Sequence, residues 1–376
     1  MREIYLDNSA TTVVCEKGIS KAINMMGENY GNPSSLHTKG LLAQNEVEHA
    51  RRVIAKELGA DETEIYFTSG GTEANNMAVF GAAFKNHRRG KRIVTTNIEH
   101  SSVHEAMQEL SKMGFEIIYL KPDLTGNVSK EQVINAVDDK TILVSMMMVN
   151  NEVGSILPVQ EVRKILDFKK SPAYFHVDAV QAFGKIPVKV SKIKADLISI
   201  SAHKVHGPKG VGALYKSRKT IILPRTFGGE QQDKVRPGTE SSPLIAAFGA
   251  AVEEFNLEKN YQYVLELRNH LIEKLSKIDE IAINSGEKSL PYIVNFSTDG
   301  IKAETMLHFL ASEGIYVSGG SACAKGKKSR VLKHLGLSDK RVTSSIRVSF
   351  SKMNTIEEID IFVEKLKLGL KSLARE

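Results

Sequence analysis

Short apolar runs alternate with amphipathic segments along roughly the first 215 residues of the chain. The apolar runs indicate buried strands, and the segments whose apolar residues recur three or four positions apart indicate helices. This strand–helix–strand rhythm predicts a mostly parallel sheet with helices on both faces. The expected strands are 64–67, 91–98, 115–120, 141–149, 174–178 and 195–200, and the expected helices are 17–26, 44–58, 72–84, one that Ser101 or Ser102 caps, and 130–137.

The last third of the chain follows a different pattern. A long helical stretch from about Ser242 to Ile278, interrupted near Asn260, leads into a mixture of strands and helices. The strands are expected at 292–296, 315–318 and 346–350, and the helices at 303–313 and 355–373. We therefore expect an α/β fold with a large domain of residues 14–257 and a smaller α+β domain of residues 1–13 and 258–376.

Composition narrows the class of protein. The 376 residues are 41% hydrophobic and 25% charged, as in ordinary soluble proteins, and no run approaches the ~20 apolar residues of a membrane span. We expect a cytoplasmic location without membrane attachment, and two cysteines, Cys15 and Cys323, suit a reducing compartment. The net charge of +7 is spread along the chain without a basic stripe, so no direct nucleic-acid binding is expected.

Polar residues follow the strand at 195–200, and Lys204 is the most informative of them. A lysine that leaves a buried strand suits a Schiff-base amine, because desolvation lowers its pKa and frees the neutral nucleophile. A solvated surface lysine is an equally good explanation of this segment alone. A metal site at His203 and His206 is not expected, because no third ligand cluster accompanies them.

Asp178 and Gln181 follow the preceding strand, 174–178, in the same way. Pyridoxal phosphate needs an anionic partner for its pyridine nitrogen and a hydrogen-bond donor for its phenolic oxygen. Asp178 and Gln181 have the chemistry for these two roles, so the lysine and this pair together predict a pyridoxal 5'-phosphate site.

A series of short motifs extends this picture along nearly the whole chain. They are Tyr5-Leu-Asp-Asn-Ser-Ala-Thr-Thr12, Thr68-Ser-Gly-Gly-Thr-Glu-Ala-Asn75, Glu99-His100, Asn150-Asn151-Glu152, the two strand ends above, Arg236-Pro-Gly-Thr239, Ser321-Ala-Cys323 and Ser345-Ile-Arg347. In this order they resemble the class V aminotransferases, and within them the cysteine desulfurases of the NifS and IscS type. The resemblance implies the pyridoxal-phosphate fold type I and a homodimer.

The resemblance also assigns the phosphate site. Gly71 and Thr72 open a helix, whose free backbone amides suit an anion, and the resemblance places the cofactor phosphate there with Ser201 and His203 beside it. Thr239 would reach the phosphate of the partner subunit's cofactor. The loop before Thr239 departs from the family pattern at residues 230–234, where glutamate, glutamine and Asp-Lys replace glycine, glutamate and Arg-Gly.

The remaining assignments concern the cofactor ring and the substrate. By resemblance His100 stacks on the pyridine ring and moves protons, and Asn151 lies beside the phenolic oxygen and the substrate. Arg347 alternates with Ile346 and Val348 along a strand, so it faces the opposite side. Its guanidinium suits the α-carboxylate of an amino acid, although a salt bridge at a strand edge would explain an arginine there equally well.

Cys323 is the expected nucleophile. It lies in a glycine-containing segment with four cations after it, surroundings that favour the thiolate, whereas Cys15 has the setting of a buried, inert cysteine. The span from Cys323 to Val331 is shorter than in the family's longer-loop members. The resemblance thus implies an L-cysteine desulfurase that forms alanine and a persulfide on Cys323 for a sulfur-acceptor protein of iron–sulfur cluster assembly or tRNA thiolation. Selenocysteine lyase or cysteine-sulfinate desulfinase activity, and a non-catalytic docking scaffold, are the alternatives.

Overall fold

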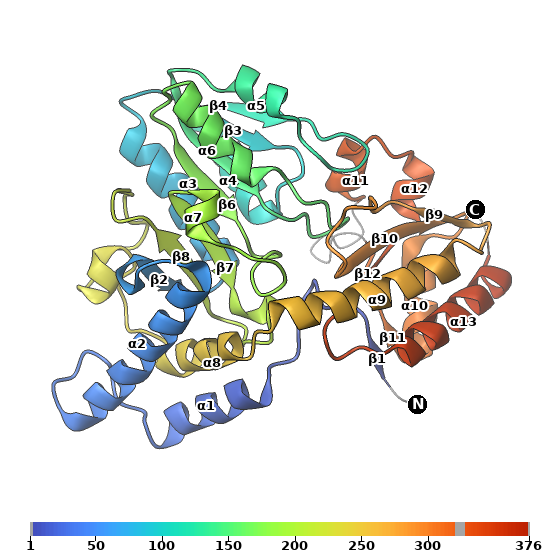
Figure 1. Ribbon diagram of the computed structural model, residues 1–376, viewed down its shortest axis with the longest axis horizontal. Helices are drawn as coiled ribbons and strands as arrows, with labels where there is room; N and C mark the ends of the chain where they lie inside the picture. Colours follow the sequence, from blue (N-terminus) through green and yellow to red (C-terminus); the bar gives the residue numbers. More distant parts are fainter. Residues whose placement is uncertain (1–2, 320–327, 375–376) are drawn as a thin grey trace.

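A seven-stranded sheet forms the centre of the computed structural model, which describes residues 3–319 and 328–374 (Figure 1). Its strands are β2 (Ile65–Thr68), β3 (Arg92–Thr96), β4 (Glu116–Leu120), β5 (Thr141–Met147), β6 (Tyr174–Asp178), β7 (Leu197–Ser201) and β8 (Gly212–Lys216). Their spatial order is β2-β8-β7-β6-β5-β3-β4, and all neighbours are parallel except β8, which is antiparallel to β7 and to β2. The predicted mostly parallel sheet is confirmed, with β8 as a strand that the pattern did not predict.

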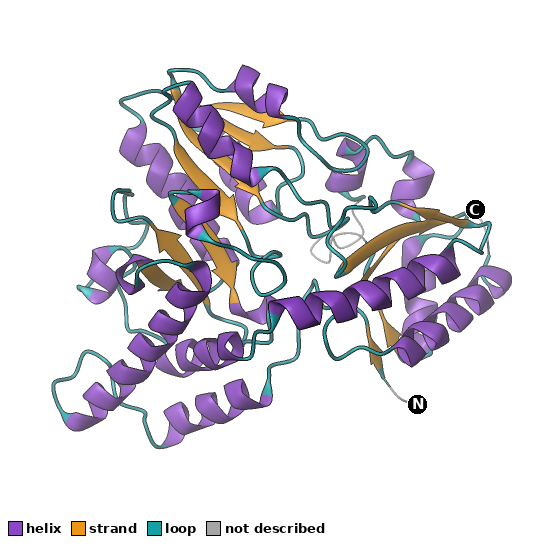
Figure 2. Ribbon diagram, in the orientation of Figure 1, coloured by secondary structure: helices purple, strands orange, loops and turns teal. Residues whose placement is uncertain are grey.

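Side chains alternate between two hydrophobic cores on opposite faces of this sheet. Ile93 and Leu143 point into one core, and their neighbours Val94 and Val144 point into the other. Helices cover both faces (Figure 2). The first core contains the apolar residues of α3 (Gly71–Asn86) and α4 (Ser101–Lys112), and the second contains those of α2 (Thr38–Leu58), α6 (Val159–Phe168) and α8 (Ser242–Glu253).

A second, smaller sheet lies beside the first. Its three antiparallel strands are ordered β12 (Ser345–Ser349), β10 (Ile293–Thr298) and β9 (Ile281–Ile283), and the nearby helices are α9 (Leu257–Leu275), α10 (Ala303–Ser312) and α13 (Ile356–Ser372). Helix α9 runs from the large sheet to the small one (Figure 1). This smaller unit matches the predicted α+β region, while the exact domain limits stay a prediction.

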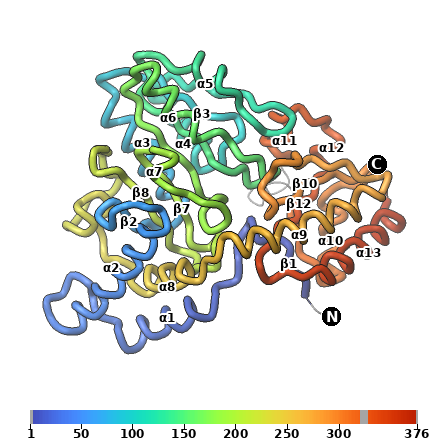
Figure 3. Tube along the Cα trace, in the orientation of Figure 1, coloured from blue at the N-terminus to red at the C-terminus, as the bar shows by residue number. Residues whose placement is uncertain are grey.

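The N-terminal segment belongs spatially to the C-terminal part of the chain. Strand β1 (Ile4–Tyr5) pairs in parallel with β11 (Ile315–Tyr316), and both chain ends lie on the side of the smaller sheet (Figure 3). Among the described residues, no helix has both the length and the apolar character needed to cross a membrane.

Three local predictions need correction. The helical stretch after Ser242 breaks at residues 254–256 and not near Asn260, because the Asn256 side chain accepts a hydrogen bond from the backbone of Lys259 and caps α9. Helix α4 is capped by His100 and not by a serine, since the His100 ring accepts from the amide of Ser102.

The third correction concerns Cys15, which is half-buried rather than buried. Its sulfur accepts a hydrogen bond from the amide of Gly18 and caps α1 (Glu16–Gly27). The remaining short helices are α5 (Lys130–Ala136), α7 (Val190–Ile193), α11 (Arg330–His334) and α12 (Asp339–Thr343), with 3-10 turns at Glu62–Glu64, Ala202–Lys204 and Gln231–Lys234.

Candidate active site

A cavity of about 250 Å³ opens where β5, β6 and β7 end, next to the start of α3 and to β12 of the smaller sheet. Ligands gather at this edge in open α/β sheets. Its lining contains the predicted residues Gly71, Thr72, His100, Asn151, Asp178, Gln181, Ser201, His203, Lys204 and Arg347, together with Ser9, Ala10, Asn75, Ser102 and Val180. Thr239 is exposed and lies outside this lining, and Cys323 falls outside the residues that the structure describes.

Lys204 reaches the cavity from the 3-10 turn that follows β7. It is half-buried, and its Nζ donates hydrogen bonds of 2.7 Å to the backbone oxygens of Ser9 and Ala10. The amide of Thr12 in turn donates to the carbonyl of His203, so the N-terminal segment is fastened to the lysine turn. A fully solvated surface lysine therefore does not describe Lys204.

Asp178 is buried at the end of β6, where two groups donate hydrogen bonds to its carboxylate. Val180 N donates to Oδ1 at 3.0 Å, and Asn75 Nδ2 donates to Oδ2 at 2.8 Å. Asn75 also donates to Ser102 Oγ, which lies 2.8 Å from Nδ1 of His100. Sequence analysis assigned no role to Asn75 and considered Ser102 only as a helix cap, yet they connect the predicted acid to the predicted histidine.

Two histidines at the cavity are kept neutral by their surroundings. Burial lowers the pKa of His100, Asp178 opposes this shift, and the positive charges of Lys204 and Arg330 add to it. Burial and Lys204 lower the pKa of His203 to about 4. A neutral imidazole at position 100 can accept a proton near pH 7, which suits a proton-transfer group.

His203 and His206 are hydrogen-bonded separately and do not converge on one point. His203 Nδ1 lies 3.2 Å from the hydroxyl of Thr11, and His206 Nδ1 lies 2.9 Å from the backbone oxygen of Val13. Within residues 3–319 and 328–374, no three His, Cys, Asp or Glu side chains form a group that could hold a metal ion.

The start of α3 has the features of a phosphate site. The 16-residue helix begins at Gly71 and directs its first amides and its dipole toward the cavity. A Cβ on Gly71 would lie 2.8 Å from Val180 Cγ2, so only glycine keeps this approach open. Ser201 Oγ is buried nearby and has no hydrogen-bond partner in the described part of the chain. An anion here would satisfy these donors, so the residues fit the phosphate of the predicted cofactor.

Arg347 lines the cavity from β12, while Ile346 and Val348 belong to the core, as the alternation predicted. The Arg347 side chain is only 1% exposed. Its Nη2 donates to Asp7 Oδ1 at 2.7 Å, and its Nη1 donates to the backbone oxygen of Asn151 at 2.9 Å. Nε is buried without a partner among the described atoms. The arginine is thus salt-bridged and lines the cavity, with one donor that no described atom uses.

The aminotransferase class-V family matches residues 4–362 of the chain. The chain belongs to this family. Among curated members, it is 42% identical to a cysteine desulfurase IscS of Methanosarcina thermophila, with 96% of this chain and 91% of the relative aligned. It is also 42% identical to a putative cysteine desulfurase, IscS 1, of Bacillus subtilis, over 96% of both chains.

Solved structures share the fold of this chain. A NifS-like protein superposes with a TM-score of 0.94 at 38% identity, covering 99% of this chain and all of the other. A structure described as SspA in complex with cysteine gives a TM-score of 0.83 at 32% identity, covering 94% of this chain and all of the other. The architecture predicted from the sequence is therefore that of a solved NifS-like protein.

The loop that departs from the class V pattern docks on the edge of the large sheet. Gln232 Nε2 donates to the backbone oxygen of Phe67 at 2.9 Å, and its Oε1 accepts from the amide of the same residue. Gln232, Asp233 and Lys234 all have positive φ, an uncommon conformation outside glycine. Strand β2 is an edge strand, so Gln232 covers peptide groups that would otherwise lack partners, and a glutamate would offer no matching donor.

Segments on both sides of the Cys323 region are fastened to the site. Before it, Ser318 pairs with the backbone of Arg347. After it, Ser329 Oγ donates to Glu152 Oε2 at 2.5 Å, and the guanidinium of Arg330 donates to the backbone oxygens of Asn97 and Glu99. One flank of the predicted nucleophile thus pairs with the lining residue Arg347, and the other bonds Glu99 and Glu152, the sequence neighbours of the lining residues His100 and Asn151.

Proposed function

We propose that this chain is a pyridoxal-phosphate-dependent L-cysteine desulfurase. The observation that carries the proposal is the single cavity that collects Lys204, Asp178 and Arg347 from three different parts of the chain. An amine, a buried carboxylate and a buried guanidinium are the groups needed to bind the cofactor covalently, hold its ring nitrogen and hold an amino acid's carboxylate.

The cofactor supplies an electron sink when it is bound, and the residues around the cavity would hold it. Lys204 would carry it through its amine, and Asp178, fixed by Asn75, would keep the pyridine nitrogen protonated. His100 would lie against the ring as a neutral proton acceptor. The start of α3, with Ser201 and His203, would bind the phosphate.

Arg347 and Asn151 would bind the substrate. Both line the cavity, and Nε of Arg347, which has no partner in the described part of the chain, would be the donor that Asp7 does not use. Cys323 would attack the sulfur of the bound cysteine. The sulfur would leave its carbon for the Cys323 thiolate as a persulfide, and protonation of the carbon would give L-alanine.

A homodimer would complete the site. Ile23 and Met26 of α1, and Tyr30 and Leu36 beyond it, are strongly exposed apolar side chains. Exposed apolar surface of this kind marks interaction sites, and a second copy would cover it. In that dimer the exposed Thr239 would bind the phosphate held by the partner subunit.

The persulfide sulfur would pass to an acceptor protein in the cytoplasm. The acceptor would act in iron–sulfur cluster assembly or in tRNA thiolation. The protein would contact neither nucleic acid nor membrane directly.

The proposal is tested by isolating the protein with its bound cofactor and reducing it with borohydride. We expect the pyridoxyl group on Lys204, and equal amounts of alanine and sulfide from L-cysteine in the presence of a thiol reductant. A pyridoxyl group on another lysine would refute the role of Lys204. Faster turnover of selenocysteine or cysteine sulfinate than of cysteine would favour the alternative activities. If the isolated protein binds no cofactor, the proposal is refuted, and a non-catalytic docking scaffold is the alternative that remains.

A further inference from the structure

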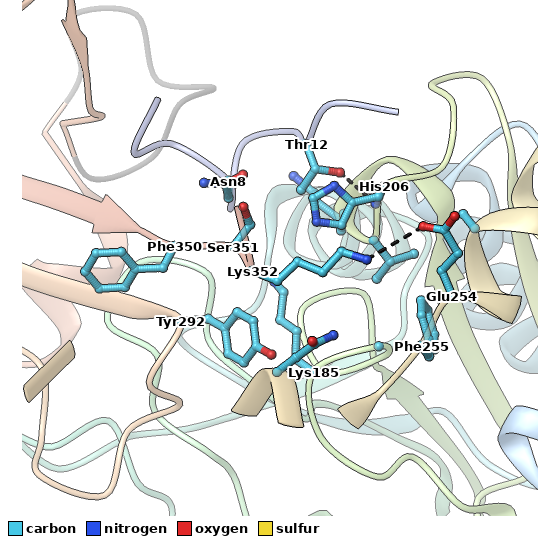
Figure 4. Close-up of a pocket in the computed structure, with 15 residues that line it drawn as sticks. Asn8, Thr12, Lys185, His206, Glu254, Phe255, Tyr292, Phe350, Ser351 and Lys352 are labelled. Atoms are coloured by element: carbon cyan, nitrogen blue, oxygen red, sulfur yellow. Dashed lines mark hydrogen bonds and ion pairs between the residues drawn. The ribbon is translucent and has the colours of Figure 1, made fainter. Parts of the chain in front are cut away.

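Lys185 is a buried lysine behind the candidate active site, with no role in the proposed reaction. It follows Gln181 by four residues, and its side chain is 5% exposed. It lines a small second cavity of about 40 Å³ that lies between the two sheets and shares Lys204 with the active-site cavity (Figure 4). Lys185 and Tyr292 lie side by side there, with Nζ 5.8 Å from the centre of the tyrosine ring.

The Tyr292 ring is the aromatic contact of the Lys185 amine, and it is a weak substitute for a counterion. In the described part of the chain no carboxylate pairs with Lys185, and burial, Lys204 and Arg347 lower its pKa to about 7. Burying an amine in such a place costs stability, and an apolar side chain would fill the same space more favourably. Its specific polar contact is a hydrogen bond of 2.8 Å from Nζ to Oε1 of Gln181.

That hydrogen bond determines which way the Gln181 amide points. A protonated lysine can only donate, so it holds the oxygen, and not the NH2 group, of Gln181 toward it, which is the orientation that the structure has. The amide nitrogen therefore lies on the other side, where it donates to the backbone oxygen of Ser9 at 3.0 Å. If the amide were reversed, its NH2 group would face the donating amine of Lys185, and its oxygen would face the backbone oxygen of Ser9.

We propose that Lys185 is a positioning residue, which fixes the amide orientation of Gln181 so that an N–H, and not the carbonyl oxygen, faces the phenolic oxygen of the cofactor. The inference rests on the proposed cofactor site. Gln181 lines the active-site cavity, and one N–H of its amide is engaged by Ser9, so the second N–H is the one available to a ligand. A carbonyl oxygen in that place would repel the phenolic oxygen.

The backbone oxygen of Ser9 links the orientation of the Gln181 amide to Lys204. Its backbone oxygen accepts from Gln181 and also from Lys204 Nζ, at 2.7 Å. Lys204 would leave this acceptor when it binds the cofactor, and the contact with Gln181 would remain. Lys185 then holds the amide from the side away from the cofactor while the lysine on the near side moves.

A double-mutant cycle separates this role from a merely structural one, because residues that act through one another are not additive. The variants are Lys185→Met, Gln181→Leu and the double variant, and the readouts are the dissociation constant for pyridoxal phosphate and the absorption maximum of the bound cofactor. Lys185→Met should weaken cofactor binding about tenfold, the value of one hydrogen bond to a charged group, and shift the absorption maximum. In the Gln181→Leu background the same substitution should change neither readout.

Lys189→Met is the matched control, because Lys189 lies four residues further on and pairs with Glu57, away from both cavities. It should bind the cofactor like the unmodified protein. If Lys185→Met does not fold, as judged by circular dichroism, Lys185→Thr takes its place, because it also loses the contact with Gln181 and tolerates water in the small cavity.

Equal weakening in both backgrounds, or none in either, would overturn the inference while leaving the proposed function intact, provided that the unmodified protein binds pyridoxal phosphate and releases sulfide. An unmodified protein that binds no pyridoxal phosphate would instead overturn both.

Discussion

Arg347 and Asp7 form an ion pair inside the protein although 340 positions separate them in the sequence. The carboxylate engages Nη2 of the guanidinium, and the backbone of Asn151 engages Nη1. Two of the three guanidinium nitrogens are thereby fixed, and Nε has no hydrogen-bond partner among residues 3–319 and 328–374. The pair holds the guanidinium in one orientation, and in the proposed function this would lower the entropy cost of binding a substrate carboxylate.

We first expect Arg347→Lys to raise KM for L-cysteine by roughly 30-fold. A lysine has a single ammonium group, so it cannot keep the contacts to Asp7 and Asn151 and also bind the carboxylate of the substrate. Steady-state kinetics measure the effect. Arg92→Lys is the control and should leave KM unchanged, because Arg92 is the first residue of β3, pairs with Glu116 and does not line the cavity. An unchanged KM in Arg347→Lys would show that the arginine is purely structural.

The second prediction concerns Asp178. Asp178→Asn should retain the cofactor but lower kcat at least roughly tenfold, because a neutral amide cannot keep the pyridine nitrogen protonated. The measurement combines the absorbance of the bound cofactor with the rate of alanine release. Normal turnover in this variant would mean that Asp178 only supports the hydrogen bonds of Asn75 and Val180.

Cys323 and Cys15 give a matched pair of substitutions. Cys323→Ser should still change the cofactor spectrum when cysteine is added but release almost no sulfide, since a serine hydroxyl stays protonated near neutral pH. Cys15→Ser should behave almost normally, because Cys15 caps α1 and burial raises the pKa of its thiol. Sulfide release that survives in Cys323→Ser would contradict the persulfide step.

The fourth prediction uses pH and the buried carboxyl group of Glu99. Burial raises its pKa to about 8, only partly offset by hydrogen bonds from Thr96 and the amide of Met147. The folded protein then binds a proton that the unfolded chain releases near pH 4.5, so stability should fall as pH rises from about 5 to about 8.

Glu99→Gln resembles the protonated acid and should remove this part of the pH dependence. We expect its Tm to equal or exceed that of the unmodified protein at pH 8, and the two to converge near pH 5. Thermal unfolding followed by circular dichroism measures both. Parallel Tm curves across this range would show that Glu99 is ionised in the folded protein.

The sequence predicted the large sheet well because its strands are continuous apolar runs followed by polar residues. That pattern also placed Asp178 and Lys204 at the sheet edge where the cavity lies. Strand β8 was missed because Gly212 and the glycine-rich turn before it obscure a short run. The break before α9 could have been predicted from Asn256, because asparagine is a favoured helix N-cap. In the structure this cap starts a new helix although the apolar spacing continues across it.

Other site residues had no local signal. Asp7 follows the short strand β1, and only the folded chain shows that its carboxylate contacts Arg347. Lys185 follows a glycine and has the local sequence of a surface loop, yet tertiary packing buries it. Asn75 and Ser102 likewise gain their roles from contacts between α3 and the start of α4. Contacts between residues far apart in the sequence depend on the folded structure, and the spacing of residues along the chain does not predict them.

The pairing of β1 with β11 has a consequence for how the protein is made. Ribosomes release the N-terminal residues first, and the large sheet can form from residues 65–216 as they emerge. Ile4 and Asp7, however, need Ile315 and Arg347 as partners. Residues 9–12 can meet Lys204 about halfway through synthesis, but Ile4 and Asp7 have to wait for these late partners, and the cavity acquires the Arg347 side of its wall only when synthesis is nearly complete.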